Sequence, residues 1–363
     1  MSVILFLLVL FVLVLVHEWG HFIAAKKTGM RVDEFGIGFP PKVFGKKKGE
    51  TEYTLNLFPI GGFVRIYGEN PEDAGEGVVD SERAFHARPK WAQTVVLLAG
   101  VFMNVVFAWL LFTITFMVGV STAVTEADAT DAAKLYVVST LPDSPAAETL
   151  PVGAVVTELS NGEDTIENPT PTSFSDFVTE NAPNAVEVTY LQSGEKMTTT
   201  ITPEVGLSET EPNKYLVGVS LSLVEKVQMP IHTAVVSGFN ATINGLVAIS
   251  TGLYGLVSDA IFGEADFSSV AGPVGIVGMV GDAAAFGVVA LLTFTAIISL
   301  NLAVINLLPF PALDGGRLLF VAIEAVTRKT IPPSWTGRLN FIGFVLLITL
   351  MVAVTYNDII RIL

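Results

Sequence analysis

The first apolar stretch of the chain carries ionisable side chains, and this feature constrains the fold more than any other. Residues 2–16 contain no charged side chain, and the apolar run continues to Ala25. About 20 such residues are enough to cross a bilayer as a helix. The run contains His17, Glu18 and His21. Ionisable groups inside a membrane helix are costly and usually functional, so the sequence predicts a polar site within a membrane.

The three residues form the pattern His-Glu-x-x-His. Histidines four residues apart lie on one face of a helix, so both imidazoles can reach one zinc ion while Glu18 reaches a water beside it. Buried packing roles are the alternative, and the cost of three ionisable groups in one apolar helix weighs against them. A signal peptide is disfavoured because there is no basic n-region and the apolar run holds the motif itself. The pattern therefore favours zinc-dependent hydrolysis.

Composition indicates an integral membrane protein, because 51% of the 363 residues are hydrophobic and only 15% are charged. The chain has no cysteine, so any zinc must be bound by histidine and carboxylate. The net charge of −15 is concentrated in residues 121–230, which contain four lysines, no arginine and 17 acidic residues. This distribution argues against nucleic acid binding.

Four segments are long and apolar enough to be membrane spans. They are about 3–25, 94–120, 285–308 and 339–356. A further stretch, about 231–262, is rich in Gly, Ser, Thr and Asn and indicates an interfacial helix rather than a fifth span. Residues 26–92 contain eleven Lys and Arg, which predicts a cytoplasmic loop. Four spans then place both termini and the acidic block outside.

The predicted cytoplasmic loop contains β-forming residues that alternate between Gly-rich and Lys-rich turns over residues 31–67. This pattern predicts β-hairpins. A simple surface hairpin is one interpretation. Beside a protease site, an unpaired strand edge could instead bind an extended substrate by strand addition.

Residues of about 127–226 form a domain-sized insert with short apolar alternations, which predicts a small β-rich domain. The Pro and Gly turns at 144–147, 151–156 and 161–162 fall in the order and spacing of PDZ modules in bacterial proteases. PDZ domains bind extended peptides along a sheet edge. The predicted domains are 1–125 (first half of a membrane core), 126–227 (PDZ-like domain) and 228–363 (second half of the core).

A second polar motif ends the third predicted span, where residues 306–317 read N-L-L-P-F-P-A-L-D-G-G-R. The prolines end a helix, and the glycines after Asp314 let the backbone turn closely. Asp314 is either a helix cap or a zinc ligand, and with His17 and His21 present and no cysteine available the ligand role is favoured. Asn306 is either a packing amide or a donor to a substrate carbonyl.

Together these motifs resemble the site-2 protease family, and within it the RseP-like bacterial enzymes of regulated intramembrane proteolysis. The resemblance is carried by H-E-W-G-H, G-I-G-F, G-G-F-V-R-I-Y-G-E, A-G-P-V-G-I and the 306–317 motif, and it covers nearly the whole chain. It implies a polytopic α-helical membrane protein of about four spans. A re-entrant β-hairpin would lie on the cytoplasmic side, and an inserted α+β PDZ-like domain outside. Many relatives carry two tandem PDZ domains, and this chain has room for one.

Carried over residue by residue, the resemblance implies one zinc ion bound by His17, His21 and Asp314, with Glu18 as the catalytic acid and base. It implies substrate contact at Asn306 and pairing of the cytoplasmic β-structure with extended substrate. The candidate residues in that β-structure are Tyr53, Leu55, Leu57, Gly61, Gly62 and Phe63.

The resemblance also implies the partners and the location. Expected substrates are single-span transmembrane proteins already trimmed on their outer side, such as anti-sigma factors, or remnant signal peptides. A peptide or substrate ectodomain would bind the PDZ-like domain. The enzyme would lie among the lipids of a bacterial cytoplasmic membrane, with its active site toward the cytoplasmic side.

Two other classes stay open. A zinc membrane protease of another class would need a glutamate as third ligand, and Glu324 is the candidate for it. A catalytically inactive, PDZ-bearing membrane adaptor is the second. The intact motif argues against the adaptor, because a scaffold has no need of Glu18.

Overall fold

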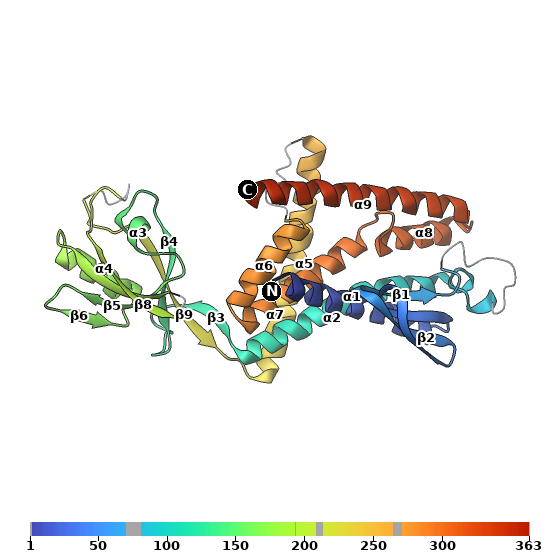
Figure 1. The fold of residues 1–363 in the computed structure, drawn as a ribbon, viewed down its shortest axis with the longest axis horizontal. Coiled ribbons are helices and arrows are strands. Elements are labelled where there is room, and N and C mark those ends of the chain that lie inside the picture. The colour runs from blue at the N-terminus through green and yellow to red at the C-terminus, as the bar shows by residue number, and fades with distance from the viewer. Residues whose placement is uncertain (1, 70–80, 193, 208–212, 264–270, 363) are drawn as a thin grey trace. The chain divides into compact units, whose positions relative to one another are not determined.

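The computed structural model describes residues 2–69, 81–192, 194–207, 213–263 and 271–362. The chain forms two compact units, a helical unit of residues 1–117 and 230–363 and an inserted domain of residues 118–229 (Figure 1). The inserted domain begins before the predicted residue 126, because β3 (Val120–Val124) pairs with β9 (Val219–Val227).

The helical unit contains long apolar helices and shorter ones between them. The long helices are α1 (Ser2–Lys27), α2 (Lys90–Val118), α5 (Ile231–Phe262), α7 (Val288–Leu307) and α9 (Pro333–Ile362), and the shorter ones are α6 (Pro273–Ala285) and α8 (Asp314–Thr327). Within the described ranges, five helices are long and apolar enough to cross a membrane, where the sequence predicted four spans. The additional one is α5, which the sequence predicted as interfacial.

Two apolar clusters hold the helical unit together. The first joins α1, the β-hairpin, α2 and α8, and it includes Ala25, Met30, Ile66, Leu97 and Val321. The second joins α2 to α7 through Ala108, Leu111, Phe112, Ala296 and Leu300. Helices α1 and α2 approach closely at Gly20, where a Cβ atom would lie 2.3 Å from the Ala99 carbonyl oxygen. The polar face of α1 is therefore held directly against α2.

Strands β1 (Val32–Lys48) and β2 (Thr51–Ile66) each pair along two separate stretches. Phe35 lies opposite both Tyr53 and Val64, and Tyr53 also lies opposite Lys46. The four segments are therefore ordered 42–48, 51–58, 32–39 and 61–66 across the sheet. The two edges of this sheet are 42–48 and 61–66, whereas 51–58 is an inner segment.

The β1–β2 turn is tied to the C-terminal end of α1 by Glu50. Its carboxylate accepts hydrogen bonds from Arg83 at 2.7 Å and from Lys26 at 2.6 Å. These bonds lower the pKa of Glu50 to about 2. The pairing fixes the hairpin against the end of the helix that carries the His-Glu-x-x-His motif.

The inserted domain is an antiparallel sheet with strand order β3-β9-β4-β5-β7-β8, and β6 pairs with β5. Its remaining elements are β4 (Lys134–Thr140), α3 (Pro145–Thr149), β5 (Val155–Ser160), β6 (Thr165–Glu167), α4 (Pro171–Asn181), β7 (Val186–Gln192) and β8 (Glu195–Ile201). A capping box of Thr170 and Ser173 starts α4. The core includes Leu135, Leu159 and Phe174.

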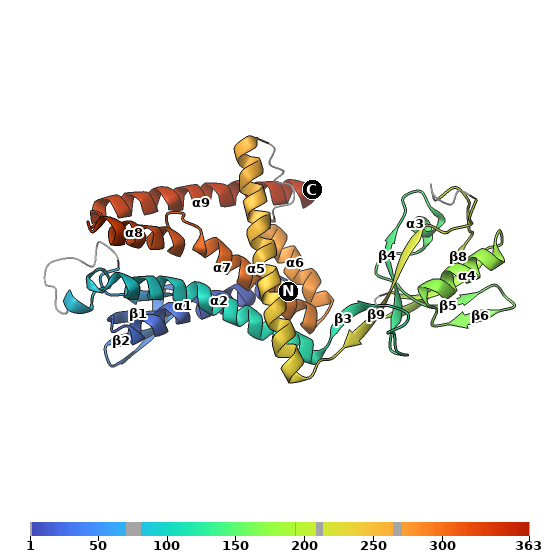
Figure 2. The same cartoon turned by 180° about the vertical axis from the view of Figure 1, so that it is seen from behind.

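Helix α5 crosses the common direction of α1, α2 and α9, and both views of the molecule agree on this (Figures 1 and 2). A helix that runs across the bundle cannot span the bilayer in the direction of α1. We therefore expect both ends of α5 to lie on the same side of the membrane, which the charge distribution of the chain predicts to be the outer side. In this cysteine-free chain, His232→Cys and Asp259→Cys should both react with an impermeant thiol reagent added outside.

The matched control for this labelling is Lys48→Cys on the hairpin, which should react only after the membrane is permeabilised. Reaction of the two α5 positions from opposite sides would make α5 a fifth span.

Candidate functional site

Three side-chain donors from the two halves of the chain meet at one point. His17 Nε2 lies 3.0 Å from Asp314 Oδ2 and 3.1 Å from His21 Nε2, and His21 Nε2 lies 3.2 Å from Asp314 Oδ2. The two histidines are buried and the Asp314 side chain is 19% exposed. In the part of the chain that the structure describes, this is the group of histidine and carboxylate side chains able to hold a metal.

The triangle fits a zinc ion. Zinc bonds of about 2.0–2.1 Å in tetrahedral geometry separate the donor atoms by about 3.3 Å. The three observed separations are close to this value, and the imidazole and carboxylate donors suit zinc. The residues present can therefore supply three ligands and leave a fourth position open.

Helix α2 orients His21 through its main chain. The Val96 carbonyl oxygen lies 2.8 Å from His21 Nδ1, so Nδ1 carries the proton and donates it. Nε2 is then the unprotonated nitrogen that faces the other donors. Such outer partners fix the tautomer of a metal-binding histidine.

Asn104 of α2 orients His17, as the Val96 carbonyl orients His21. Its buried side-chain amide lies 3.2 Å from His17 Nδ1, and Ser299 donates a 2.8 Å hydrogen bond to its main-chain oxygen. Among the described residues, Asn104 Oδ1 is one of two buried side-chain atoms without a hydrogen-bond partner. A 180° turn of the amide exchanges its oxygen and nitrogen and lets Oδ1 accept His17 Nδ1–H. In the sequence, Asn104 is only an interruption of an apolar span, although a polar residue inside a span is itself a signal of function.

Gly100 makes room for the histidines. A Cβ atom at this position would lie 2.3 Å from His21 Nε2 and 2.8 Å from His17 Cε1. Gly100 and Asn104 are four residues apart and face the same side of α2, toward α1.

Glu18 lies between the donor triangle and the edge segment 61–66. The Val64 N–H donates a 3.1 Å hydrogen bond to Glu18 Oε2, so this group points away from the inner segment 32–39. In a strand, successive residues alternate in direction, so the main-chain groups of Gly62 also point outward. The edge therefore places hydrogen-bonding groups next to the glutamate.

Asp314 is the first residue of α8, immediately after a tight reversal of the chain. A Cβ atom at Gly315 would lie 2.2 Å from the Leu308 carbonyl oxygen, and one at Gly316 would lie 2.2 Å from that of Phe310. The two glycines therefore allow the start of α8 to fold back onto the end of α7.

The other predicted site residues lie in three different segments of the structure. Asn306 is half-buried near the end of α7. Gly61, Gly62 and Phe63 belong to the edge segment, whereas Tyr53, Leu55 and Leu57 belong to the inner segment, whose main chain is paired on both sides. Substrate contact by Tyr53, Leu55 and Leu57 stays a prediction, and in this structure it would involve their side chains, because their main chain is already paired. Sequence alternation is the same in every segment and does not reveal their order.

Glu324, the alternative third ligand, lies away from the triangle. Its carboxylate accepts hydrogen bonds from Lys90 Nζ at 2.5 Å and from the Ile331 N–H at 2.8 Å. It is ten residues beyond Asp314 on α8 and is not part of the donor group.

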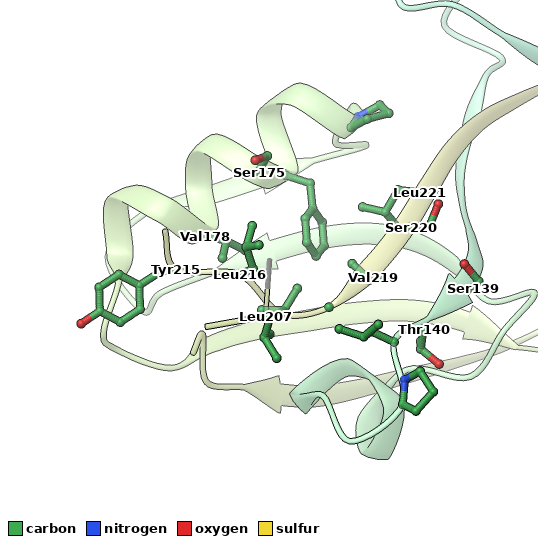
Figure 3. Close-up of a pocket in the computed structure, with 16 residues that line it drawn as sticks. Ser139, Thr140, Ser175, Val178, Leu207, Tyr215, Leu216, Val219, Ser220 and Leu221 are labelled. Carbon is green, nitrogen blue, oxygen red and sulfur yellow. The ribbon is translucent and has the colours of Figure 1, made fainter. Parts of the chain in front are cut away.

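The inserted domain has a groove of its own. A cavity of about 460 Å³ lies between α4 and the start of β9, and Val178, Leu216 and Val219 surround it (Figure 3). Strand β4 pairs with β9 from Val219, whereas β3 pairs on the other side only from Leu223. Residues 219–222 therefore leave a strand edge beside an apolar cavity, which can take up an extended peptide.

A glutamate between two histidines, with an aspartate as third donor in a set of apolar helices, defines the class of zinc metallopeptidases that work within membranes. The model of Peptidase family M50 matches residues 5–350, and the chain belongs to this family, the site-2 proteases. It is a zinc metalloendopeptidase.

The similar proteins match along their whole length. A provisionally named zinc metalloprotease of Clostridium perfringens is 38% identical over 99% of both chains. The zinc metalloprotease RasP of Oceanobacillus iheyensis is 30% identical over 99% of both chains. The regulator of sigma-W protease RasP of Bacillus subtilis is 30% identical over 99% of this chain and 98% of its own. A solved PDZ domain of an SdrC-like protein from Listeria monocytogenes covers 26% of this chain and 92% of its own, with 20% identity and a TM-score of 0.21.

Replacement of Asn104 tests its role toward His17. Asn104→Ala should weaken zinc binding and cleavage by about 10- to 100-fold, because His17 loses the group that fixes its tautomer. Competition against a chelator measures the zinc affinity. Asn301→Ala is the matched control, since that amide donates to the Ile297 carbonyl of its own helix. Equal zinc affinity of the two variants would contradict the role of Asn104.

Replacement of Gly100 tests the close packing of α2 on the histidines. Gly100→Ala should reduce zinc content and cleavage strongly, because the added methyl group collides with His21 Nε2. Gly278→Ala on α6 adds the same group where nothing lies within 4 Å and should leave both properties unchanged. Zinc content by elemental analysis of the purified variants provides the comparison. A fully loaded, active Gly100→Ala enzyme would show that the packing is looser than described.

Proposed function

We propose that this protein cleaves the transmembrane segments of single-span membrane proteins, with one zinc ion held by His17, His21 and Asp314. The observation that carries the proposal is the donor triangle between the apolar helix α1 and the start of α8, directly beside Glu18, whose carboxylate contacts the edge segment 61–66. Peptide hydrolysis needs a metal site, a base and a means to hold extended substrate, and these three lie together.

The residues of this chain have distinct tasks in the reaction. When bound, zinc supplies a Lewis acid that polarises a carbonyl group and lowers the pKa of water. Glu18 accepts a proton from the attacking water and returns it to the leaving nitrogen. Asn306 donates a hydrogen bond to the substrate carbonyl oxygen as negative charge develops there.

A substrate helix must unwind before its peptide bonds can be reached, because each amide is hydrogen-bonded and shielded from water. Unpaired backbone groups are expensive within a membrane. The edge segment 61–66 offers replacement hydrogen bonds through the outward main-chain groups of Gly62 and the carbonyl of Val64, whose N–H is bonded to Glu18, and Phe63 and Gly61 complete the contact. Tyr53, Leu55 and Leu57 of the inner segment have exposed side chains, and they contact the substrate through these side chains rather than by main-chain pairing.

The inserted domain binds a peptide or a substrate ectodomain at the edge of residues 219–222. It lies outside the bacterial cytoplasmic membrane, as its acidic composition and the positive charge of residues 26–92 favour. The active site then lies toward the cytoplasmic side. Because one relative is by name a regulator of sigma-W, a trimmed anti-sigma factor is the first substrate class to test, and remnant signal peptides are the second.

The test compares purified wild type, Glu18→Gln and Asp314→Ala on a model single-span substrate with a short ectodomain. We expect about one zinc per chain in the wild type and in Glu18→Gln, and cleavage by the wild type alone. Asp314→Ala should bind zinc weakly because it loses one of three ligands. Glu324→Ala should keep its zinc, which separates Asp314 from the alternative ligand.

Each other outcome has a defined meaning. Full zinc occupancy without cleavage of any single-span substrate by the wild type would favour a membrane adaptor that binds peptides through the inserted domain. A wild-type protein without zinc would contradict the site itself. Retention of zinc in Asp314→Ala with loss in Glu324→Ala would indicate a zinc protease of another class.

A further inference from the structure

An ion pair connects the hairpin to the helix that carries Asp314. The Arg317 guanidinium contacts the Glu69 carboxylate, and the two side chains are 33% and 13% exposed. Arg317 lies one helical turn after Asp314 on α8, and Glu69 follows the edge segment by three residues. The sequence motifs alone assign no role to either residue.

The link between Glu69 and the edge segment is short and tightly packed. The Glu69 N–H donates to the Ile66 carbonyl in a turn, and the Tyr67 N–H donates to the Arg31 carbonyl. Gly68 has a φ of +71°, and a Cβ atom there would lie 2.6 Å from the Ala84 Cβ. A displacement of Glu69 is therefore transmitted to the end of the edge segment.

Residues 64–69 contact both Glu18 and α8, the helix that carries Asp314. Val64 is bonded to Glu18, and Glu69, five residues later, is paired on α8. The edge segment is thus fixed at one point to the catalytic glutamate and at the other to the helix of Asp314. Its position along the strand direction is defined relative to the donor triangle.

We infer that the Glu69–Arg317 pair is a positioning device that sets which peptide bond of the substrate lies at the site. This inference rests on the proposed strand addition at segment 61–66. A strand advances about 3.3 Å per residue, and its side chains alternate between the two faces of the sheet. A substrate strand that shifts along the edge by two residues therefore keeps each side chain on its original face, whereas a shift of one residue does not. An edge that is loosened from α8 therefore allows substrate to be cut two residues away from the normal position as well as at it.

A second ion pair on the same helix provides a matched comparison. Lys90 Nζ lies 2.5 Å from Glu324, with side chains 33% and 17% exposed. Both pairs line one cavity of about 390 Å³. The Lys90–Glu324 pair ties α8 to α2 and makes no connection to the edge segment, so it reports what loss of an ion pair on α8 does in general.

The experiment uses the full-length enzyme and a model single-span substrate, with cut positions determined by mass spectrometry. The variants are Glu69→Gln, Arg317→Gln, the double variant of these two, and Glu324→Gln. We expect Glu69→Gln to lower cleavage at the main position by about 10- to 100-fold and to add a cut two residues away. Arg317→Gln should give the same pattern, and the double variant should be no worse than either, because both changes remove one interaction.

Glu324→Gln should keep a single cut position and the wild-type rate within about twofold. Glu69→Asp retains the charge but shortens the side chain, so it tests the inference if Glu69→Gln fails to fold, and it should also broaden the cut positions. Unchanged cut positions in Glu69→Gln, or in Glu69→Asp where only that variant folds, would overturn the inference while wild-type cleavage still supports the proposed function. Absence of cleavage by the wild type would instead reject the proposed function.

Discussion

The structure depends on bringing three ionisable side chains to one point inside apolar helices. His17 and Asp314 come from opposite ends of the chain, and their donor atoms lie 3.0 Å apart. Buried polar groups without partners are costly, so each ring nitrogen that faces away from the triangle needs its own acceptor. Helix α2 supplies these acceptors, and its closeness is possible because Gly20 and Gly100 lack side chains. The helix packing follows from the requirements of the site.

The two edges of the hairpin sheet differ in charge, and the proposed strand addition requires such a difference, because one edge must accept a strand and the other must not. The edge 42–48 carries Lys42, Lys46, Lys47 and Lys48, and charged lysines on an edge discourage pairing with other strands. The edge 61–66 lies beside Glu18 and contains the glycines at 61 and 62. In the proposed strand addition, this difference in charge between the two edges would direct an incoming strand to the edge beside Glu18.

The sequence predicts the parts of this site that depend on local spacing. Two histidines four residues apart must share a helical face, and the absence of cysteine leaves Asp314 as a natural third donor. Asn104 and the Glu69–Arg317 pair were not predicted, because their roles arise only when separate elements meet. The inner position of Tyr53 was missed for a related reason, since strand order in a folded-back hairpin depends on bulges and register shifts. The α5 helix was located correctly within a residue or two, and its apolar length alone did not determine its orientation.

The loop before Asp314 shows why α9, an otherwise little-buried helix, belongs to the site. Ala312 has a φ of +76°, a conformation that costs a non-glycine residue about 1–2 kcal/mol. Such strain persists only where the surroundings impose it. Asn340 of α9 accepts a hydrogen bond from the Ala312 N–H, and a Cβ atom at Gly343 would lie 2.3 Å from the Pro311 carbonyl oxygen. Helix α9 therefore packs on one side of the strained turn, and the end of α7 packs on the other. Together they fix the start of α8 so that Asp314 points at the two histidines.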